Sequence, residues 1–101
     1  MRHSKPHNLI DETIHQRTRL AIMAALAGVA SLEFTDLKAE LGLTDGNLST
    51  HLTALERAGY VKLTKRFRKR KPQTTVRQTA KGRKALTAYV DLLENILNKA
   101  R

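Results

Sequence analysis

The chain has 101 residues, 41% of them hydrophobic, and a formal net charge of +10 at pH 7. This length suits one domain with a modest core and leaves no room for a second. The absence of cysteine excludes a disulfide framework, a thiolate metal site and a thiol redox sensor, and it suits a cytoplasmic protein. The longest nearly uncharged stretch, residues 20–32, is well short of the roughly 20 apolar residues that span a bilayer.

The first third of the chain predicts an arm, a helix and a very short strand. Residues 1–8 are polar and are expected to form a flexible N-terminal arm. Apolar residues at helical spacing, from Ile10 and Ile14 onward, predict a first helix over residues 9–27, which Gly28 ends. Residues 32–34 are too few for more than one strand pair.

Two further helices separated by a tight turn predict a helix-turn-helix. Thr35 is expected to cap a brief helix over residues 36–41, which Gly42 terminates. Thr44 is expected to cap a second helix over residues 45–58, with Gly59 left-handed after its end.

The helix over residues 45–58 has one apolar and one polar side. Its leucines cluster on one side, and the opposite side is short and polar. That outward side consists of Gly46, Asn47, Thr50, Thr53 and Arg57, with Asp45 and Ser49 at its edges. Short side chains permit close approach, and the free amides of a first helical turn favour an anion. We therefore predict that this helix reads bases, with Asp45 either supporting the helix dipole or accepting from a cytosine amine.

A basic hairpin follows. Apolar residues alternate with polar ones from Tyr60 to Thr64, a second strand is predicted over residues 74–79, and Pro72 marks a loop over residues 68–73. We predict that residues 65–73 are a wing that contacts phosphates, with Arg70 alternatively entering a minor groove. The run could instead be a solvated charge cluster or a nuclear localisation signal. Phe67 could stack on a base, but packing in the core or against the hairpin is commoner for such a residue.

The charge distribution indicates a polyanionic partner, because residues 57–90 contain no Asp or Glu to compensate a dense series of Lys and Arg. Nucleic acid is the first choice. The predicted DNA-binding set comprises Asp45, Gly46, Asn47, Ser49, Thr50, Thr53, Arg57, Lys65, Arg66, Arg68, Lys69, Arg70, Lys71 and Arg77.

A last helix, capped by Thr79, is predicted over residues 80–98. Its apolar stripe is broader than a small core requires, which predicts a seam with a second copy, assisted by the first helix. The predicted dimer interface comprises Ile10, Ile14, Leu86, Tyr89, Val90, Leu93, Ile96 and Leu97.

Three segments, LKAELGLT (residues 37–44), NLSTHLTALERAGYV (residues 47–61) and TAKGRKAL (residues 79–86), resemble the winged helix-turn-helix transcription regulators of the MarR and ArsR type. The resemblance spans about residues 9–93 and implies a mainly α fold with a small β-hairpin, in the order α-β-α-α-β-β-α. It also implies a homodimer on duplex DNA, with the second motif helix in the major groove and the wing on the backbone. The family's DNA-facing positions fall on Asp45, Asn47, Ser49, Thr50 and Thr53.

The leading hypothesis is a sequence-specific transcription regulator, acting as a repressor, because so small a domain has little surface for recruiting polymerase. The alternative is an RNA-binding or ribosome-associated winged-helix module. No nucleophile setting or glycine-rich phosphate loop indicates an enzyme. No cofactor, metal or membrane partner is expected, since Pro6 opposes a helical pairing of His3 and His7. The sequence names no effector.

Overall fold

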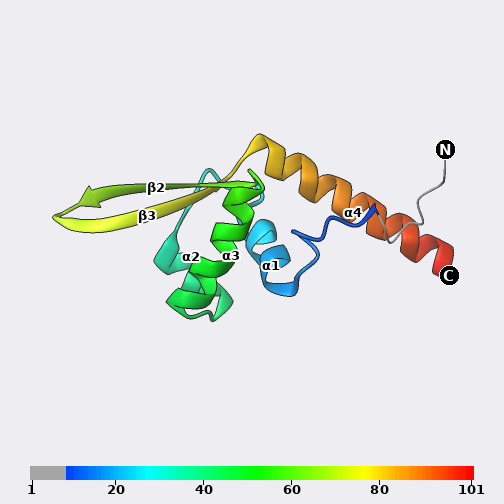
Figure 1. The fold of residues 1–101 in the computed structure, drawn as a ribbon, viewed down its shortest axis with the longest axis horizontal. Coiled ribbons are helices and arrows are strands. Elements are labelled where there is room, and N and C mark those ends of the chain that lie inside the picture. Colours follow the sequence, from blue (N-terminus) through cyan, green and yellow to red (C-terminus); the bar gives the residue numbers. More distant parts are fainter. Residues whose placement is uncertain (1–8) are drawn as a thin grey trace.

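The computed structural model describes residues 9–101, and the predicted arm lies outside this part of the chain. Within it the elements are α1 (Arg17–Leu26), β1 (Leu32–Glu33), α2 (Phe34–Leu41), α3 (Asp45–Arg57), β2 (Val61–Arg68), β3 (Lys71–Gln78) and α4 (Ala80–Ala100) (Figure 1). This order confirms the predicted mainly α fold with a small β-hairpin.

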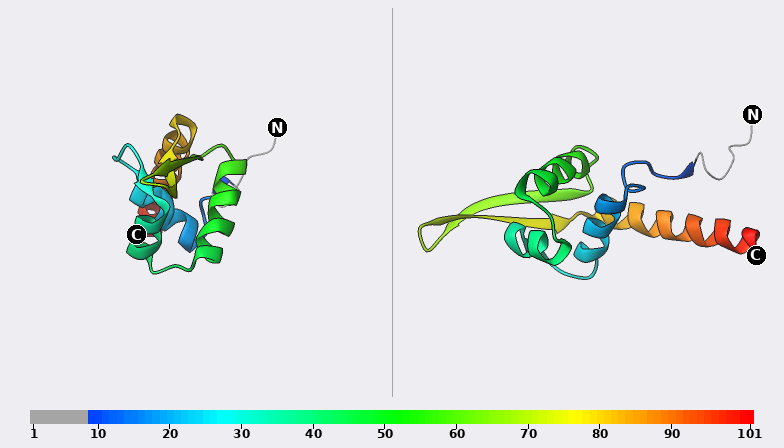
Figure 2. Two further views of the ribbon diagram at one scale, coloured as in Figure 1. Left: turned by 90° about the vertical axis from the view of Figure 1, so that its left-hand side faces the viewer. Right: turned by 90° about the horizontal axis from the view of Figure 1, so that it is seen from below.

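The sheet is antiparallel, with strand order β1-β3-β2. Its long β2–β3 hairpin extends past α2 and α3 at one end of the molecule, and α4 extends past the body at the other (Figures 1 and 2). The molecule is therefore elongated, with principal extents of 56 × 27 × 23 Å. We call the β2–β3 hairpin the wing.

The core lies where the first three helices meet the base of the wing. It consists of Ile22, Met23 and Leu26 from α1, Leu37 from α2, Leu48, Leu52 and Leu55 from α3, Val61 from β2 and Val76 from β3. The leucines predicted to form the inner side of α3 are thus buried. Gln78 is buried beside them, and its Nε2 donates to the Met23 carbonyl oxygen at 3.0 Å, so the amide is not left unpaired.

The predicted caps of α3 and α4 are confirmed. Thr44 accepts a hydrogen bond from the Asn47 amide at 3.1 Å, and Thr79 accepts one from the Gly82 amide at 3.0 Å. Gly59, just past the end of α3, is left-handed at φ 82°, as predicted.

The first helix begins at Arg17, and the prediction that it begins at residue 9 was wrong. The Asp11 carboxylate accepts hydrogen bonds from the amides of Thr13 and Ile14, which makes a local turn before the helix. Gln16 then adopts an extended backbone and caps α1 by accepting from the Arg19 amide at 2.8 Å.

The predicted cap of the second helix was also wrong. Thr35 lies inside α2, which begins at Phe34 with Glu33 as its N-cap. The reason is that β1 leads directly into the helix, which lets Phe34 pack against the core.

The wing is longer than predicted, because the basic tip is strand rather than loop. Only Lys69 and Arg70 form the turn, and both have positive φ, at 52° and 65°. Two consecutive left-handed residues define a type I′ turn, whose twist matches that of the flanking strands. Pro72 lies in β3 opposite Phe67, one pair beyond the turn-closing pair Arg68 and Lys71. That position needs no N–H from Pro72 toward β2, so the proline does not break the ladder.

Candidate nucleic-acid interface

The polar side of α3 is at the surface. All seven residues predicted there are exposed, namely Asp45, Gly46, Asn47, Ser49, Thr50, Thr53 and Arg57. The periodicity of the sequence therefore gave the correct outward side, because the buried leucines fix the helix's rotation. A helix rigidly held by its inner side presents short polar groups that can approach another molecule closely.

Hydrogen bonds within α3 determine what these groups can offer. The Thr53 hydroxyl donates to the Ser49 carbonyl oxygen at 2.9 Å, so toward a partner Thr53 presents a methyl group and acceptor lone pairs. The Asn47 backbone amide is occupied by Thr44, while its side chain extends from the exposed first turn and can both donate and accept.

Asp45 forms an ion pair with Lys38 of α2, with 2.7 Å between Nζ and Oδ1. The pair offsets the carboxylate's repulsion of a phosphate at this end of α3. It also ties the two helices of the helix-turn-helix together. This contact favours the structural interpretation of Asp45 over a direct contact with a base.

The front of the wing and α3 converge on a shared groove. Alternation along the strands places Leu63, Lys65 and Phe67 on the same face of the wing as the buried Val61. We call this face, which includes Pro72, Thr74 and Val76 of β3, the front face. A groove of about 510 Å³ lies between it and α3, lined by Phe34, Ser49, Thr53, Glu56, Leu63, Lys65 and Thr74.

Most of the wing's cations lie on the opposite, back face, which is lined by Lys62, Arg66, Arg68, Lys71 and Arg77. The register sets Lys62 directly across from Arg77 and Arg68 across from Lys71. Like charges in such cross-strand pairs repel each other, so an anion bound near the back face would stabilise the hairpin. The wing thus carries positive charge on both faces and at its turn, rather than in a single row.

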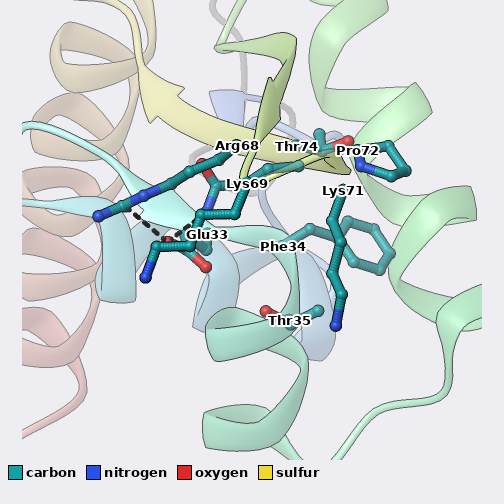
Figure 3. A pocket seen from close by; sticks show the side chains of 9 residues that line it. Glu33, Phe34, Thr35, Arg68, Lys69, Lys71, Pro72 and Thr74 are labelled. Carbon is teal, nitrogen blue, oxygen red and sulfur yellow. Dashed lines mark hydrogen bonds and ion pairs between the residues drawn. The ribbon is translucent and has the colours of Figure 1, made fainter.

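Glu33 is an acidic residue set among these cations. Its Oε1 accepts a hydrogen bond from Gln73 Nε2 at 2.6 Å and lies 4.0 Å from the Arg68 guanidinium. Gln73 in turn accepts from Arg66 Nε at 3.1 Å. A groove of about 560 Å³ runs beside this network, between the start of α2 and β3 (Figure 3). These contacts link the start of α2 to the wing.

His51 lies half-buried on the inner flank of α3. Its Nδ1 is 3.5 Å from the Arg19 guanidinium of α1. Burial, and then the charge of Arg19, lower the pKa of His51 below its ordinary value of 6.5. Neutral His51 thus belongs to the α1–α3 contact rather than to the exposed side of α3.

The residues predicted for a dimer seam fall into two groups. Ile14 and Tyr89 are buried within the single chain, and the Tyr89 hydroxyl lies 2.7 Å from His15 Nδ1, so neither has much surface for a partner. Val90 is 43% exposed and Leu97 is 56% exposed, both on α4. The partly exposed members are Ile10, Leu86, Leu93 and Ile96. An apolar strip on α4 therefore remains available.

The model of the winged helix DNA-binding domain family matches residues 18–97. The chain belongs to this family. The uncharacterized protein MJ0432 of Methanocaldococcus jannaschii is 43% identical over 72 residues, which are 71% of this winged helix chain and 78% of that protein. A transcriptional regulator homologue from Pyrococcus horikoshii OT3 superposes with a TM-score of 0.84 at 30% identity, covering 89% of both chains.

The fold also matches that of the M. tuberculosis transcriptional regulator MOSR, whose structure was solved in complex with DNA. The TM-score is 0.68 at 22% identity, covering 88% of this winged helix chain and 63% of the MOSR chain. The family match and the likeness to these transcriptional regulators confirm the winged helix resemblance seen in the sequence.

The sequence missed or left open three residues, and two of them, Glu33 and Phe67, lie on or beside the wing. Glu33 accepts a hydrogen bond from Gln73 of the wing, 40 residues away in the sequence, which no local pattern reveals. Gly82 lies within the TAKGRKAL segment that carries the resemblance. Only the structure shows why this residue is a glycine, because it packs directly against the backbone of Tyr60. Phe67 is 79% exposed, so neither the core nor the hairpin buries its ring.

Within residues 9–101 no group of three or more metal-ligating side chains stands together, and His3 and His7 lie outside the described part of the chain. In the same part of the chain, no helix combines the length and the apolar character needed to cross a membrane.

Proposed function

We propose that this winged helix protein is a sequence-specific regulator of transcription that binds duplex DNA as a homodimer and acts as a repressor. In this proposal α3 lies in the major groove, and the wing follows the backbone or enters the minor groove. The observation that carries the proposal is the groove shared by α3 and the wing. Ser49 and Thr53 line one wall and Lys65 the other, so base-reading groups and a phosphate-binding cation face the same partner.

The base-reading role rests on the outer side of α3. Asn47, Thr50 and Thr53 lie on successive turns of that exposed side. A side-chain amide can pair with adenine through two hydrogen bonds, and the methyl group of a threonine can contact that of thymine. Gly46, Ser49 and Arg57 extend the contact to the backbone, while Asp45 holds the helix in place through Lys38.

The positioning role rests on the wing's cations. Lys65, Lys69 and Arg70 are on the front face or at the turn, where the phosphates flanking the grooves would lie. Cations of the back face reach DNA around the edges of a narrow two-stranded ribbon, and they add to the field that attracts it. This second group consists of Arg66, Arg68, Lys71 and Arg77.

The dimer rests on α4. Its apolar strip, from Leu86 to Leu97, lies partly on a segment that extends beyond the body of the chain (Figure 1). Exposed strips of this kind are typical of interfaces between subunits. Because the wing and the far end of α4 are at opposite ends of the long axis, pairing through α4 leaves both wings free.

The repressor role follows from size, because binding DNA and pairing through α4 leave little surface for recruiting another protein. We further propose that the protein acts in the cytoplasm, without a cofactor and without enzymatic activity. A family of DNA-binding domains and a chain without cysteine support this view.

The test is an unbiased selection of bound sequences from a random duplex pool, repeated with structured RNA as competitor. The proposal predicts enrichment of a two-fold symmetric motif, with half-sites about one helical turn apart. RNA that competes as well as the selected duplex would support the RNA-binding alternative. A pool that shows no enrichment over several rounds would refute sequence-specific binding.

A further inference from the structure

Phe67 is an aromatic side chain held in solvent near the tip of the wing. It is 79% exposed, more than any other large hydrophobic residue in the part of the chain that the structure describes. Its partner across the hairpin is Pro72. The two stand at a pair of the kind that lacks cross-strand hydrogen bonds, where side chains lie closest together. They therefore form one apolar knob.

This knob is on the front face of the wing, the face that shares a groove with α3. Phe67 is four residues beyond Leu63, which lines that groove. A strand rises about 3.3 Å per residue, which places Phe67 roughly 13 Å further out. The centres of adjacent major and minor grooves are separated by about half a helical turn, or roughly 17 Å. With α3 in the major groove, the knob reaches the neighbouring minor groove.

The charge around Phe67 defines the kind of partner. Lys65, Arg66, Arg68 and Lys69 surround it in the sequence, and β3 adds Lys71 across the hairpin. The centres of protein interfaces are depleted of such lysines, and desolvating so many cations would be costly. Apolar surfaces set between regularly spaced anions are instead characteristic of nucleic acid, where sugars and bases lie between phosphates.

We propose that Phe67 and Pro72 form an apolar wedge that enters the minor groove, contacts the sugars and bases of one step, and bends the duplex. This inference rests on the proposed function and adds a recognition element to it. Apolar wedges of Phe or Pro partly unstack a base step and kink DNA toward the major groove. Pyrimidine–purine steps such as TA are the most easily kinked and unstacked. The wedge therefore selects for such a step without reading a base edge.

The wing's turn supports a wedge that keeps its shape. The strands pair without a gap up to the pair Arg68 and Lys71. A type I′ turn closes them without splaying. Glu33 then links the wing to the start of α2 through its hydrogen bond with Gln73. A wedge on such a hairpin enters DNA with little loss of conformational entropy.

The test compares the wild-type chain with Phe67→Ala, Phe67→Leu and a back-face control, Thr64→Ala. Affinity for the selected duplex is measured across a salt series, and bending is measured by energy transfer between dyes at the duplex ends. Phe67→Ala is expected to bind roughly a hundredfold more weakly, because each of the two subunits loses one aromatic contact and each loss weakens binding roughly tenfold. Its salt dependence should match that of the wild type, because no charge is removed.

The bend should be lost in Phe67→Ala, largely kept in Phe67→Leu, and unchanged in Thr64→Ala. A Phe67→Ala chain that binds and bends the duplex like the wild type would overturn the wedge and leave the proposed function standing. If Phe67→Ala weakened binding to single-stranded DNA but not to the duplex, that result would also overturn the wedge. If the wild-type chain itself fails to bind any duplex, the proposed function fails, and the wedge fails with it.

Discussion

Gly82 of α4 lies directly against the backbone of Tyr60. A Cβ added to Gly82 would stand 2.2 Å from the Tyr60 carbonyl oxygen and 2.9 Å from its carbonyl carbon. The same carbonyl oxygen accepts a hydrogen bond from the Thr79 amide at 3.0 Å. The start of α4 is therefore pressed onto the start of the wing, and this contact sets the direction of α4 relative to α3.

Gly82→Ala is expected to destabilise the fold, because backbone cannot move aside as a flexible side chain can. Overpacking of this kind costs about 1–3 kcal/mol. The free energy of unfolding, measured with urea, should fall by about 2 kcal/mol. An alanine variant as stable as the wild type would show that α4 is not closely packed at this point.

Gly46→Ala should have the opposite effect on stability, and it serves as the matched control. A Cβ at Gly46 meets no atom within 4 Å, and the residue lies in the first turn of α3. Replacing a helical glycine with alanine stabilises by up to about 1 kcal/mol. Affinity for DNA should nevertheless fall, because the added methyl group would face the phosphate that the proposed function places there. Unchanged affinity, measured by fluorescence anisotropy, would mean that the backbone at Gly46 does not approach DNA.

Tyr60→Phe should reveal a pH-dependent contribution to stability. The hydrogen bond to Asp11, then burial, then the charge of Asp11 raise the pKa of Tyr60 to about 12. Because the neutral phenol is favoured in the folded chain, its stabilisation is complete below the ordinary pKa of about 10. It is lost as pH rises from about 10 to about 12.

Unfolding of the wild type and Tyr60→Phe should therefore be compared from pH 8 to 12. A hydrogen bond to a charged group contributes about 1.5–3 kcal/mol, and partial exposure of this one suggests the lower end. The free energy of unfolding of the wild type should exceed that of Tyr60→Phe by about 1–2 kcal/mol at pH 8. This difference should vanish toward pH 12. A difference that stays constant across this range would rule out the contact as its source.

Leu97→Glu should separate the proposed dimer without unfolding the chain, since Leu97 is 56% exposed in one copy. Burying a carboxylate in an apolar seam is costly. Sedimentation at micromolar concentration should show wild-type dimer and variant monomer, and DNA binding should weaken in parallel. Asn95→Glu, on the exposed and opposite side of α4, should remain dimeric. A wild-type chain that is monomeric at this concentration would contradict the proposed dimer interface on α4.

The sequence predicted elements where short-range chemistry determines them. Thr44, Thr79 and Gly59 act within one turn of their own helices, and their positions were predicted correctly. The start of α1 was not, because Asp11 uses its carboxylate to cap a local turn and to hold the distant Tyr60. Apolar spacing alone could not reveal that competition.

The candidate site shows the same division. The outward side of α3 followed from the leucines opposite it, since a helix has a fixed period. The wing's cations were predicted as one phosphate-contacting group. Lys65 and Arg66 lie on opposite faces because β2 continues through them to Arg68, and the sequence had predicted that strand only as far as Thr64. Register depends on the turn, and a type I′ turn made by Lys69 and Arg70 lacks the glycine or asparagine that normally indicates one.

The proposed function assigns base reading to α3 and backbone contacts to the cations of the wing. The most direct test measures affinities for the selected duplex and a scrambled duplex across a salt series, for the wild type, Asn47→Ala and the double variant Lys69→Gln, Arg70→Gln. Asn47→Ala should lose about 1–3 kcal/mol of discrimination per contact and keep the wild-type salt slope. The double variant should lose affinity for both duplexes alike, with a slope smaller by about 3–4 units for two phosphate contacts in each of two subunits. Equal losses on both duplexes for Asn47→Ala, together with an unchanged slope for the double variant, would contradict both assignments.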